Sequence, residues 1–495
     1  MLKTANPRPL FALTLAALLA GCSAGPDFRP VPPPPDAGYA AGPLLLRTAS
    51  ADHTLLGEAQ QVDAGMDRGA LWWRKLGSAP LNALIDQALQ ASPTLAAAQA
   101  TLRQAEATEA AQTGALQLPR VDASVGSQRQ RMSPSAQGQA GEGRSFNLHN
   151  AGIGVRYQLD LAGGNRRALE ALAARTDYRR YELEGARLAL AASIVRAAVT
   201  QAQQAAQLDA LAATVASQDG QLQLTRQRLR LGQATQGDVL ALQAQLEQAR
   251  AGLPPLRKQH QHSAHLLALL AGQSPAAPGL PAFTLQDFTL PTQLPLVIPS
   301  ELVRQRPDVQ AAQALVHAAN ADYGVAVARL YPQINLSANL GAQALTTGAL
   351  FGSGSAVWGL VGQITQPLFN PALPAERRAA LAALDAATAH YQGVVLEALR
   401  SVADALRALE HDAETLAALA RADAAAQSSL RQVQQQVALG AASHLQLLVA
   451  EQQAHSSRAP LAAAQAQRLL GSAALYQAVG AGWAGAPEWA VSARE

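Results

Sequence analysis

Residues 92–100 read SPTLAAAQA, and residues 306–314 read RPDVQAAQA. Two further stretches are echoed in the same order: LPRVDAS (118–124) by YPQINLS (331–337), and LGQAT (231–235) by LGAAS (439–443). The offset falls only from 214 to 208 residues between the first echo and the last. Such a period is far too long for a solenoid. The sequence therefore predicts two large repeats, residues 92–271 and 307–477, each laid out as helix, hairpin, long helix, turn and helix.

Residues 1–21 have the features of an export signal rather than of a folded element. Two basic residues stand near the start, and residues 10–20 form an apolar stretch of 11 residues, too short to span a bilayer as a stable helix. Small residues then precede Cys22, a pattern that resembles a bacterial lipoprotein signal in which Cys22 becomes the lipidated N-terminus. The non-acidic Ser23 resembles a sorting signal for the outer membrane. An ordinary secretory signal that contains a cysteine is the alternative, and residues 22–39 are expected to form a lipid anchor and a proline-rich tether.

Composition and charge exclude several classes of protein. Without the first 21 residues, Lys and Arg number 36 and Asp and Glu 35, so the net charge is +1, which leaves no electrostatic footprint for nucleic acid. Charged residues make up 15% of the chain and aromatic residues 4%, a composition that suits close-packed helices with small residues at their contacts. The sequence has no zinc-protease, phosphate-loop or nucleophile-elbow motif, so neither catalysis nor a cofactor is expected.

One histidine cluster has a spacing that could hold a metal ion. It consists of His260, His262 and His265, of which His262 and His265 would share one face of a helix. A weak metal site and a solvated helix face both fit this spacing. The solvated face is the simpler interpretation, and no metal is expected.

Two stretches are long enough to form helices of unusual length. Residues 166–231 contain no proline, and residues 374–439 contain only Pro374, at a position where a helix starts. Each helix would reach about 100 Å, so neighbouring helices must support it. Apolar residues of the second stretch step by four and three positions, the period of coiled-coil packing: Val395, Leu399, Val402, Leu406, Leu409, Ala413 and Leu416. A more interrupted series follows the first stretch: Leu208, Leu211, Val215, Leu222 and Leu229. An ordinary dimeric coiled coil is the alternative.

Each long helix is expected to have two shorter neighbours. They cover residues 93–117 and 235–271 in the first half, and residues 307–330 and 443–477 in the second. Their combined lengths nearly match the long helix, so we expect each short pair to stack end to end beside it. Pro254, Pro255 and Pro460 lie within the second short helix of their half and should kink or break it.

A hairpin is expected in each half, at about residues 120–162 and 333–367. Apolar residues alternate with polar ones along each arm, and an arm of roughly ten residues has the length of a transmembrane strand. Four strands cannot close a barrel, and an open sheet edge cannot lie in lipid. Three chains would supply twelve strands, above the roughly eight of the smallest known barrels. A small soluble sheet is the alternative.

Several short motifs follow one another over the whole chain: Cys22, GPDFRP (25–30), WW (72–73), YQLDL (157–161), RPDV (306–309), YPQI (331–334) and the two Leu-Gly turns. This order resembles the outer-membrane efflux channel family, the TolC-like proteins, and within it the lipoprotein branch of drug-efflux outer-membrane factors. The resemblance implies a mainly α-helical fold with a membrane β-barrel. A homotrimer would share a twelve-stranded barrel and a twelve-helix periplasmic tunnel, with a belt built from residues 40–91, 272–306 and 478–495.

The resemblance also implies a function. The chain would be a passive exit duct in the outer membrane for drugs or other small toxic compounds. A periplasmic adaptor protein would connect it to an inner-membrane pump. An exit duct for secreted protein, and a structural lipoprotein that spans the periplasm without a channel, are the alternatives.

By the same resemblance, the turns after the long helices form the periplasmic tip. The residues that would contact the adaptor are Leu231, Gly232, Thr235, Leu439, Gly440 and Ser443. Asp238 corresponds to an acidic gate position of the family, and three copies in a trimer would form a charged ring at the pore. Gln446 stands where some relatives carry an acid, so the ring formed by its three copies would be uncharged. Local chemistry also explains these turns, because glycine suits a helix end, a hydroxyl caps the next helix, and the helix dipole favours an acid in the first turn.

Overall fold

The computed structural model describes residues 24–32, 38–39, 47–64, 66, 69, 71–133, 138, 140 and 142–482. Cys22 and most of the C-terminal segment 478–495 lie outside the described residues. The backbone forms two compact units: a first unit of Met1–Val31, Thr101–Arg179 and Ala311–Tyr391, and a second unit of Pro32–Ala100, Arg180–Gln310 and Gln392–Glu495. Each unit therefore draws on both halves of the sequence.

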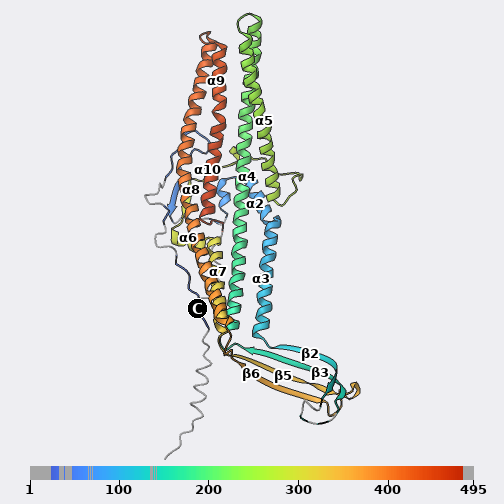
Figure 1. Cartoon of the computed structure of the whole chain (residues 1–495). Coiled ribbons are helices and arrows are strands. Elements are labelled where there is room, and N and C mark those ends of the chain that lie inside the picture. Colours follow the sequence, from blue (N-terminus) through green and yellow to red (C-terminus); the bar gives the residue numbers. More distant parts are fainter. Residues whose placement is uncertain are drawn as a thin grey trace, which may run out of the picture. The chain divides into compact units, whose positions relative to one another are not determined.

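The first unit contains a four-stranded antiparallel sheet. Its strands are β2 (Arg120–Met132), β3 (Arg144–Leu159), β5 (Gln333–Ala344) and β6 (Ala356–Thr365), in the order β2-β3-β5-β6 (Figure 1). Each half supplies one hairpin, and β3 pairs with β5 from His149 opposite Ala344 to Leu159 opposite Ile334. The outer strands β2 and β6 are the edges of the sheet.

The two faces of this sheet differ in chemistry. Because side chains alternate along a strand, the register assigns each residue to a face. One face, called here the apolar face, carries Val121, Val125, Ile153, Val155, Leu159, Ile334, Leu336, Leu340, Trp358, Leu360 and Ile364. The opposite face is mainly polar: it carries Asp122, Ser124, Gln128, Asn150, Arg156, Asn335, Ser337, Asn339 and Gln363, with Val357 and Val361 on β6 as apolar exceptions. The apolar face is not covered within the chain, since Trp358 is 79% exposed and Leu360 75%.

The helices of the two repeats are α3 (Pro93–Gln117), α4 (Gly164–Arg230), α5 (Gln236–Leu270), α7 (Pro307–Ala328), α8 (Ala372–Ala438), α9 (His444–Ser456) and α10 (Arg458–Ala478). Both α4 and α8 have 67 residues. Every residue of the second-half apolar series on α8 is buried, from 0% exposed at Val395 to 8% at Leu406, which confirms that register. The first-half series on α4 is less deeply packed. Leu222 is buried against Val239 and Leu246 of α5, while the other members of the series are half-buried.

The prolines of α5 do not break the helix. This helix continues unbroken through Pro254 and Pro255, and both side chains are exposed. The backbone carbonyls that lose a partner one turn earlier therefore lie on the exposed side of the helix, where water can bind them. In the second half the chain does break, at Ser457 between α9 and α10, and Pro460 lies in the first turn of α10, where a missing N–H is tolerated.

Segments outside the repeats pack into the second unit. A short strand β1 (Gln61–Ala64) pairs in parallel with β4 (Gln293–Leu296), and the same segments contain α2 (Ala79–Ala91), α6 (Pro299–Gln305), η1 (Trp72–Leu76) and η3 (Leu285–Asp287). The sequence had not indicated the β1–β4 pair. Trp72 of η1 is fully buried and stacks on Tyr476 of α10, with 5.3 Å between ring centroids.

A buried polar network ties the same segments to α10. The Arg468 guanidinium, in a residue 1% exposed, donates hydrogen bonds to the Glu58 carbonyl and to Oε1 of Gln60, both over 3.0 Å. Gln60 in turn donates from Nε2 to Oγ of Ser472 and to the Pro291 carbonyl, both over 2.8 Å. These bonds join residues 58–60, residue 291 and α10 at one point. No helix among the described residues is both long and apolar enough to cross a membrane.

Candidate functional site

The two turns that follow the long helices have the same backbone geometry. After α4, the Gln233 N–H donates to the Arg228 carbonyl over 2.8 Å and the Gly232 N–H to the Leu229 carbonyl over 3.0 Å. After α8, Ala441 and Gly440 repeat both bonds at the same distances. Gly232 and Gly440 both have φ of 71°, so each is the left-handed residue that ends a helix in a Schellman motif. A Cβ at either glycine would have no atom within 4 Å.

The next helix starts in the same way in both turns. Oγ1 of Thr235 accepts from the Asp238 N–H over 3.2 Å, while the Asp238 carboxylate accepts from the Thr235 N–H over 2.8 Å. Ser443 and Gln446 form the equivalent pair, in which the amide oxygen of Gln446 accepts from the Ser443 N–H over 2.8 Å. Both pairs are capping boxes. The structure thus gives Asp238 and Gln446 a clear local role at the start of α5 and α9.

The tips are exposed, and their charge differs between the two turns. Leu231 is 72% exposed and Leu439 is 83% exposed, so each turn presents an uncovered leucine beside its glycine. Hydrogen bonds from the backbone and side chain of Thr235 hold the pKa of Asp238 below its usual range, with help from Arg228. Asp238 is therefore ionised at neutral pH, whereas Gln446 carries no charge.

Below the tips, side chains connect α4 to α9 within the second unit. Gln221 donates from Nε2 to the Leu448 carbonyl over 2.9 Å, and Ser217 Oγ donates to the Glu451 carboxylate over 3.0 Å. These contacts could not be predicted from local sequence patterns, because more than 220 residues separate the partners. They link the α4–α5 hairpin to the α8–α9 hairpin at a point close to both tips.

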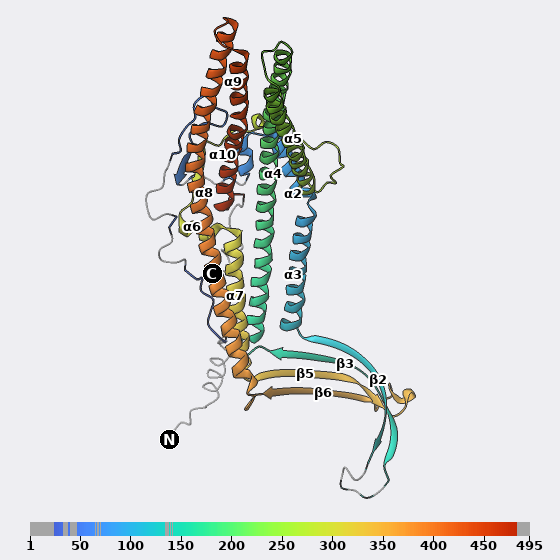
Figure 2. The ribbon, with the colours of Figure 1, turned by 45° about the horizontal axis from the view of Figure 1, so that its top comes forward.

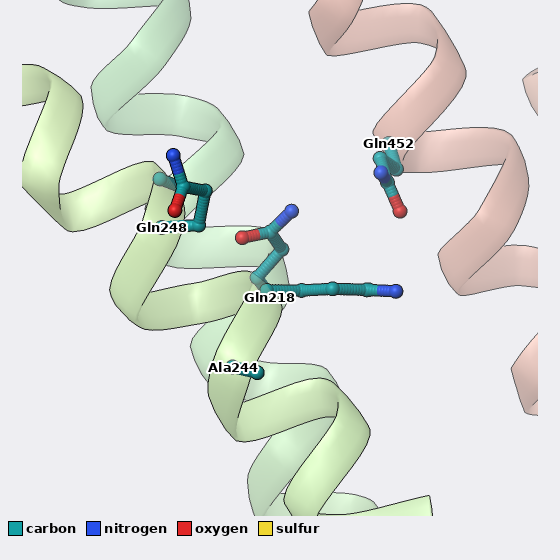
Figure 3. A pocket seen from close by; sticks show the side chains of 6 residues that line it. Gln218, Ala244, Gln248 and Gln452 are labelled. Atoms are coloured by element: carbon teal, nitrogen blue, oxygen red, sulfur yellow. The ribbon is translucent and has the colours of Figure 1, made fainter.

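An open, amide-lined hollow lies beside these links. Its lining residues are Gln218, Ala244, Gln245, Gln248, Ala249 and Gln452, and Figure 3 shows Gln218 and Gln452 facing it from opposite hairpins. Gln218 is 5% exposed, and its Oε1 has no hydrogen-bond partner among the described residues. A buried amide oxygen without a partner costs stability. The hydrogen-bonding groups around the hollow are therefore less completely paired than those of the capped tips.

The described segment that follows the predicted lipidation site is docked on the first unit. Arg167 of α4, whose side chain is 5% exposed, is the centre of the contact. Its guanidinium donates to the Ala24 carbonyl over 3.2 Å, to Asp27 over 2.6 Å and to Glu170 over 2.7 Å. Residues 24–31 are called the N-terminal strap below.

Two further helices hold the strap. Phe28 stacks on the His317 ring of α7, with centroids 4.3 Å apart, and His317 Nε2 lies 2.8 Å from the Glu170 carboxylate. Asn320 of α7 donates to the Pro26 carbonyl over 3.0 Å, and the Tyr391 hydroxyl of α8 donates to the Val31 carbonyl over 3.2 Å. The GPDFRP motif (25–30) therefore packs against α4 and α7, and Val31 of the strap contacts α8.

The strap should loosen when Arg167 is removed and when Glu170 is protonated. The hydrogen bond from His317 and the contact with Arg167 lower the pKa of Glu170, so above its ordinary pKa the ionised carboxylate stabilises the folded arrangement of Arg167 and His317, the two side chains that contact the strap. That contribution is lost as the pH falls through the lowered folded value. We expect amide hydrogen exchange at Ala24, whose N–H donates to the Ala162 carbonyl, to be about tenfold faster in Arg167→Ala at pH 7.

Arg175→Ala is the matched control for this measurement, because Arg175 lies on the same helix and pairs with Asp322 away from the strap. A Glu170→Gln variant should remove the acid-dependent part of the protection. Equal exchange at Ala24 in Arg167→Ala and in wild type would contradict the role assigned to Arg167.

The histidine cluster of α5 lies on the surface. His262 and His265 are exposed and His260 is half-buried. Across the part of the chain that the structure describes, no group of three or more His, Cys, Asp or Glu side chains is placed to hold a metal ion. The histidines thus have the surroundings of a solvated helix face.

Comparison with known proteins gives one result at the level of the family. The family model of the outer membrane efflux proteins matches residues 84–273 and 298–481. The matches begin at 84 and 298 and end at 273 and 481, which gives the same offsets of 214 and 208 residues as the sequence echoes.

Individual proteins are similar over nearly the whole chain. The probable efflux pump outer membrane protein TtgC of Pseudomonas putida is 29% identical, with 96% of each chain covered. The outer membrane protein OprJ of Pseudomonas aeruginosa is 28% identical, with 95% of each covered. Among solved structures, the outer-membrane channel OprN is 28% identical with a TM-score of 0.81, over 93% of this chain and 100% of that one.

Proposed function

The chain belongs to the outer membrane efflux protein family, and from this premise we propose that it is the outer-membrane channel of a tripartite efflux system. It would be a passive exit duct that carries drugs or other small toxic compounds from the periplasm to the exterior. The observation that carries this proposal is the four-stranded sheet with one apolar and one polar face, placed at the ends of helices of 67 residues.

The sheet supports a trimer as the working form. Its apolar face suits lipid and its polar face suits a water-filled lumen, but β2 and β6 each leave one edge unpaired within the chain. Such edges are not tolerated in lipid. Pairing β2 of one copy with β6 of the next would close twelve strands from three copies and remove every edge.

The tips support contact with a periplasmic adaptor protein that leads to an inner-membrane pump. Leu231 and Leu439 are apolar and uncovered, and they sit on turns held rigid by a Schellman motif and a capping box. In a trimer, three copies of Asp238 would place like charges around the pore, while three copies of Gln446 would form an uncharged ring. The bonds from Gln221 and Ser217 to α9 would hold the two hairpins of each chain together in the closed state.

The strap supports anchoring by a lipid at Cys22. A single acyl chain binds a membrane only marginally, so the shared barrel would be the main anchor. Docking of residues 24–31 on three helices would set the place of the lipid relative to the first unit.

The test is to substitute the tip glycines. Valine at Gly232 or Gly440 meets no atom but must adopt positive φ, at a cost of roughly 1–2 kcal/mol. We expect Gly232→Val and Gly440→Val to remain trimers by native mass in mild detergent. In cells that lack their own outer-membrane channel, these variants should fail to lower dye accumulation, whereas wild type lowers it.

Gly220→Ala is the matched control, because Gly220 lies within α4 with no atom near an added Cβ and without positive φ. It should behave as wild type in both assays. A wild-type monomer would leave the sheet edges open and would rule out the shared barrel. Normal efflux by both valine variants would remove the tip from the adaptor contact.

A further inference from the structure

The β2–β3 hairpin continues beyond the rest of the sheet. Pairing of β3 with β5 stops at His149, opposite Ala344, whereas pairing of β3 with β2 continues to Arg144, opposite Met132. Residues 128–132 and 144–148 therefore form a two-stranded ribbon past the end of β5 and β6 (Figure 2). The ribbon lies at the end of the sheet opposite to the start of α4.

Two arginines of the ribbon lie on the apolar face of the sheet. Because side chains alternate along β2, Arg129 and Arg131 point to the same side as Val121 and Val125. Both arginines are exposed, and neither forms an ion pair with any residue that the structure describes. The Arg131 side chain lies over Gly143: a Cβ added to Gly143 would be 2.8 Å from Nε of Arg131.

The arginines at the other end of the sheet are in a different situation. Arg120 and Arg156 point to the polar face, where both pair with Asp122, at 2.9 Å and 3.4 Å. From residue 127 to residue 149 the sequence holds three arginines but only one acid, Glu142. The ribbon is therefore cationic, and among the described residues no acid pairs with its two apolar-face arginines.

Strand length places these arginines just beyond a hydrocarbon layer. β5 has 12 residues, about 40 Å at 3.3 Å per residue. At the usual tilt of about 40° it covers about 30 Å of height, the thickness of a bilayer core. Arg129 follows Val125 by four residues, about 13 Å along the strand, and so reaches the level of lipid headgroups on the side away from the helices.

We propose that Arg129 and Arg131 bind the phosphate groups of lipid headgroups in the outer leaflet. This inference rests on the proposed function, because it requires the apolar face to contact lipid. A guanidinium forms paired hydrogen bonds to phosphate oxygens, and the two side chains, two residues apart on one face, follow each other along the strand. A phosphorylated glycolipid in that leaflet would supply the counter-charge that the described part of the chain does not provide.

The experiment compares Arg129→Gln/Arg131→Gln with wild type in phosphatidylethanolamine vesicles that contain bis-phosphorylated lipid A. Bound lipid A is counted by native mass spectrometry after mild extraction. A basic residue at a charged membrane surface contributes about fivefold, so the double variant should retain lipid A about thirtyfold less tightly. Arg120→Gln/Arg156→Gln is the control, since it removes two arginines of the same sheet from the opposite face, and it should bind as wild type.

Each outcome decides the proposal. Dephosphorylated lipid A should bind wild type as weakly as it binds the double variant, and millimolar inorganic phosphate should not displace lipid A. Equal retention by wild type and the double variant, or displacement by free phosphate, would overturn lipid-phosphate binding while leaving the channel intact. Failure of wild type to float with vesicles would overturn this proposal together with the proposed function.

Discussion

Leu416→Asp should abolish the folded second unit. Leu416 is fully buried in α8 and packs in one cluster with Ala51, Ala417 and Ala464. Loss of a buried leucine side chain costs about 2–5 kcal/mol through transfer and cavity terms, and a buried, unpaired carboxylate adds several more. The sum is comparable with the whole stability of a typical domain, about 5–15 kcal/mol. We expect no trimer by native mass and strongly reduced yield of folded protein.

Thr415→Asp is the matched control for Leu416→Asp. Thr415 is the neighbouring residue on α8 but is exposed, and threonine and aspartate have similar helix propensities. This variant should give normal trimer yield and a thermal midpoint close to that of wild type. If both variants lost the trimer, helix propensity or surface charge, rather than burial at the coiled-coil register, would explain the effect.

Arg468→Ala should produce the second-largest loss. Removing the guanidinium leaves the Glu58 carbonyl and the Gln60 amide oxygen without their buried donor, and an arginine-sized cavity opens beside α10. Each buried acceptor left without a partner costs about 1–3 kcal/mol, and the cavity adds to this loss. Burial lowers the pKa of Arg468, but an arginine keeps its charge at any pH of interest, so the loss should not depend on pH between 6 and 8.

The measurement is the guanidinium chloride midpoint of purified trimer. Arg407→Ala is the control, because Arg407 lies on the surface of α8 with a half-exposed side chain paired to Glu410. Such pairs contribute at most about 1 kcal/mol. A midpoint shift in Arg468→Ala no larger than in Arg407→Ala would show that the polar network is not a major source of stability.

The features that could be predicted from the sequence are patterns whose members lie only a few residues apart. The apolar series of α8 repeats every three to four residues, and all of its members are buried. The alternation along β2, β3, β5 and β6 and the glycine and hydroxyl of each tip are equally local. Those patterns, with their spacing across the chain, were enough to reach the fold and the family.

Contacts over long sequence distances were not predictable. β1 has four residues, too few for alternation to be recognised, and its partner β4 lies more than 200 residues away. Arg167 and Arg468 look like any other helical arginine, and only the folded chain places them under the strap and inside the polar network. The break expected at Pro254 and Pro255 does not occur, because the cost of a helical proline depends on whether its side of the helix faces water.

The two capping boxes separate the shape of a tip from its electrostatics. A carboxylate at 238 and an amide at 446 place an oxygen at the same 2.8 Å from the backbone N–H of the capping residue. Either side chain can therefore occupy this position without moving the turn. The charge of the tip can change while its backbone geometry stays the same. An Asp238→Gln exchange would leave both capping boxes uncharged, and Gln446→Glu would add a charge to the second, with the backbone of both turns unaltered.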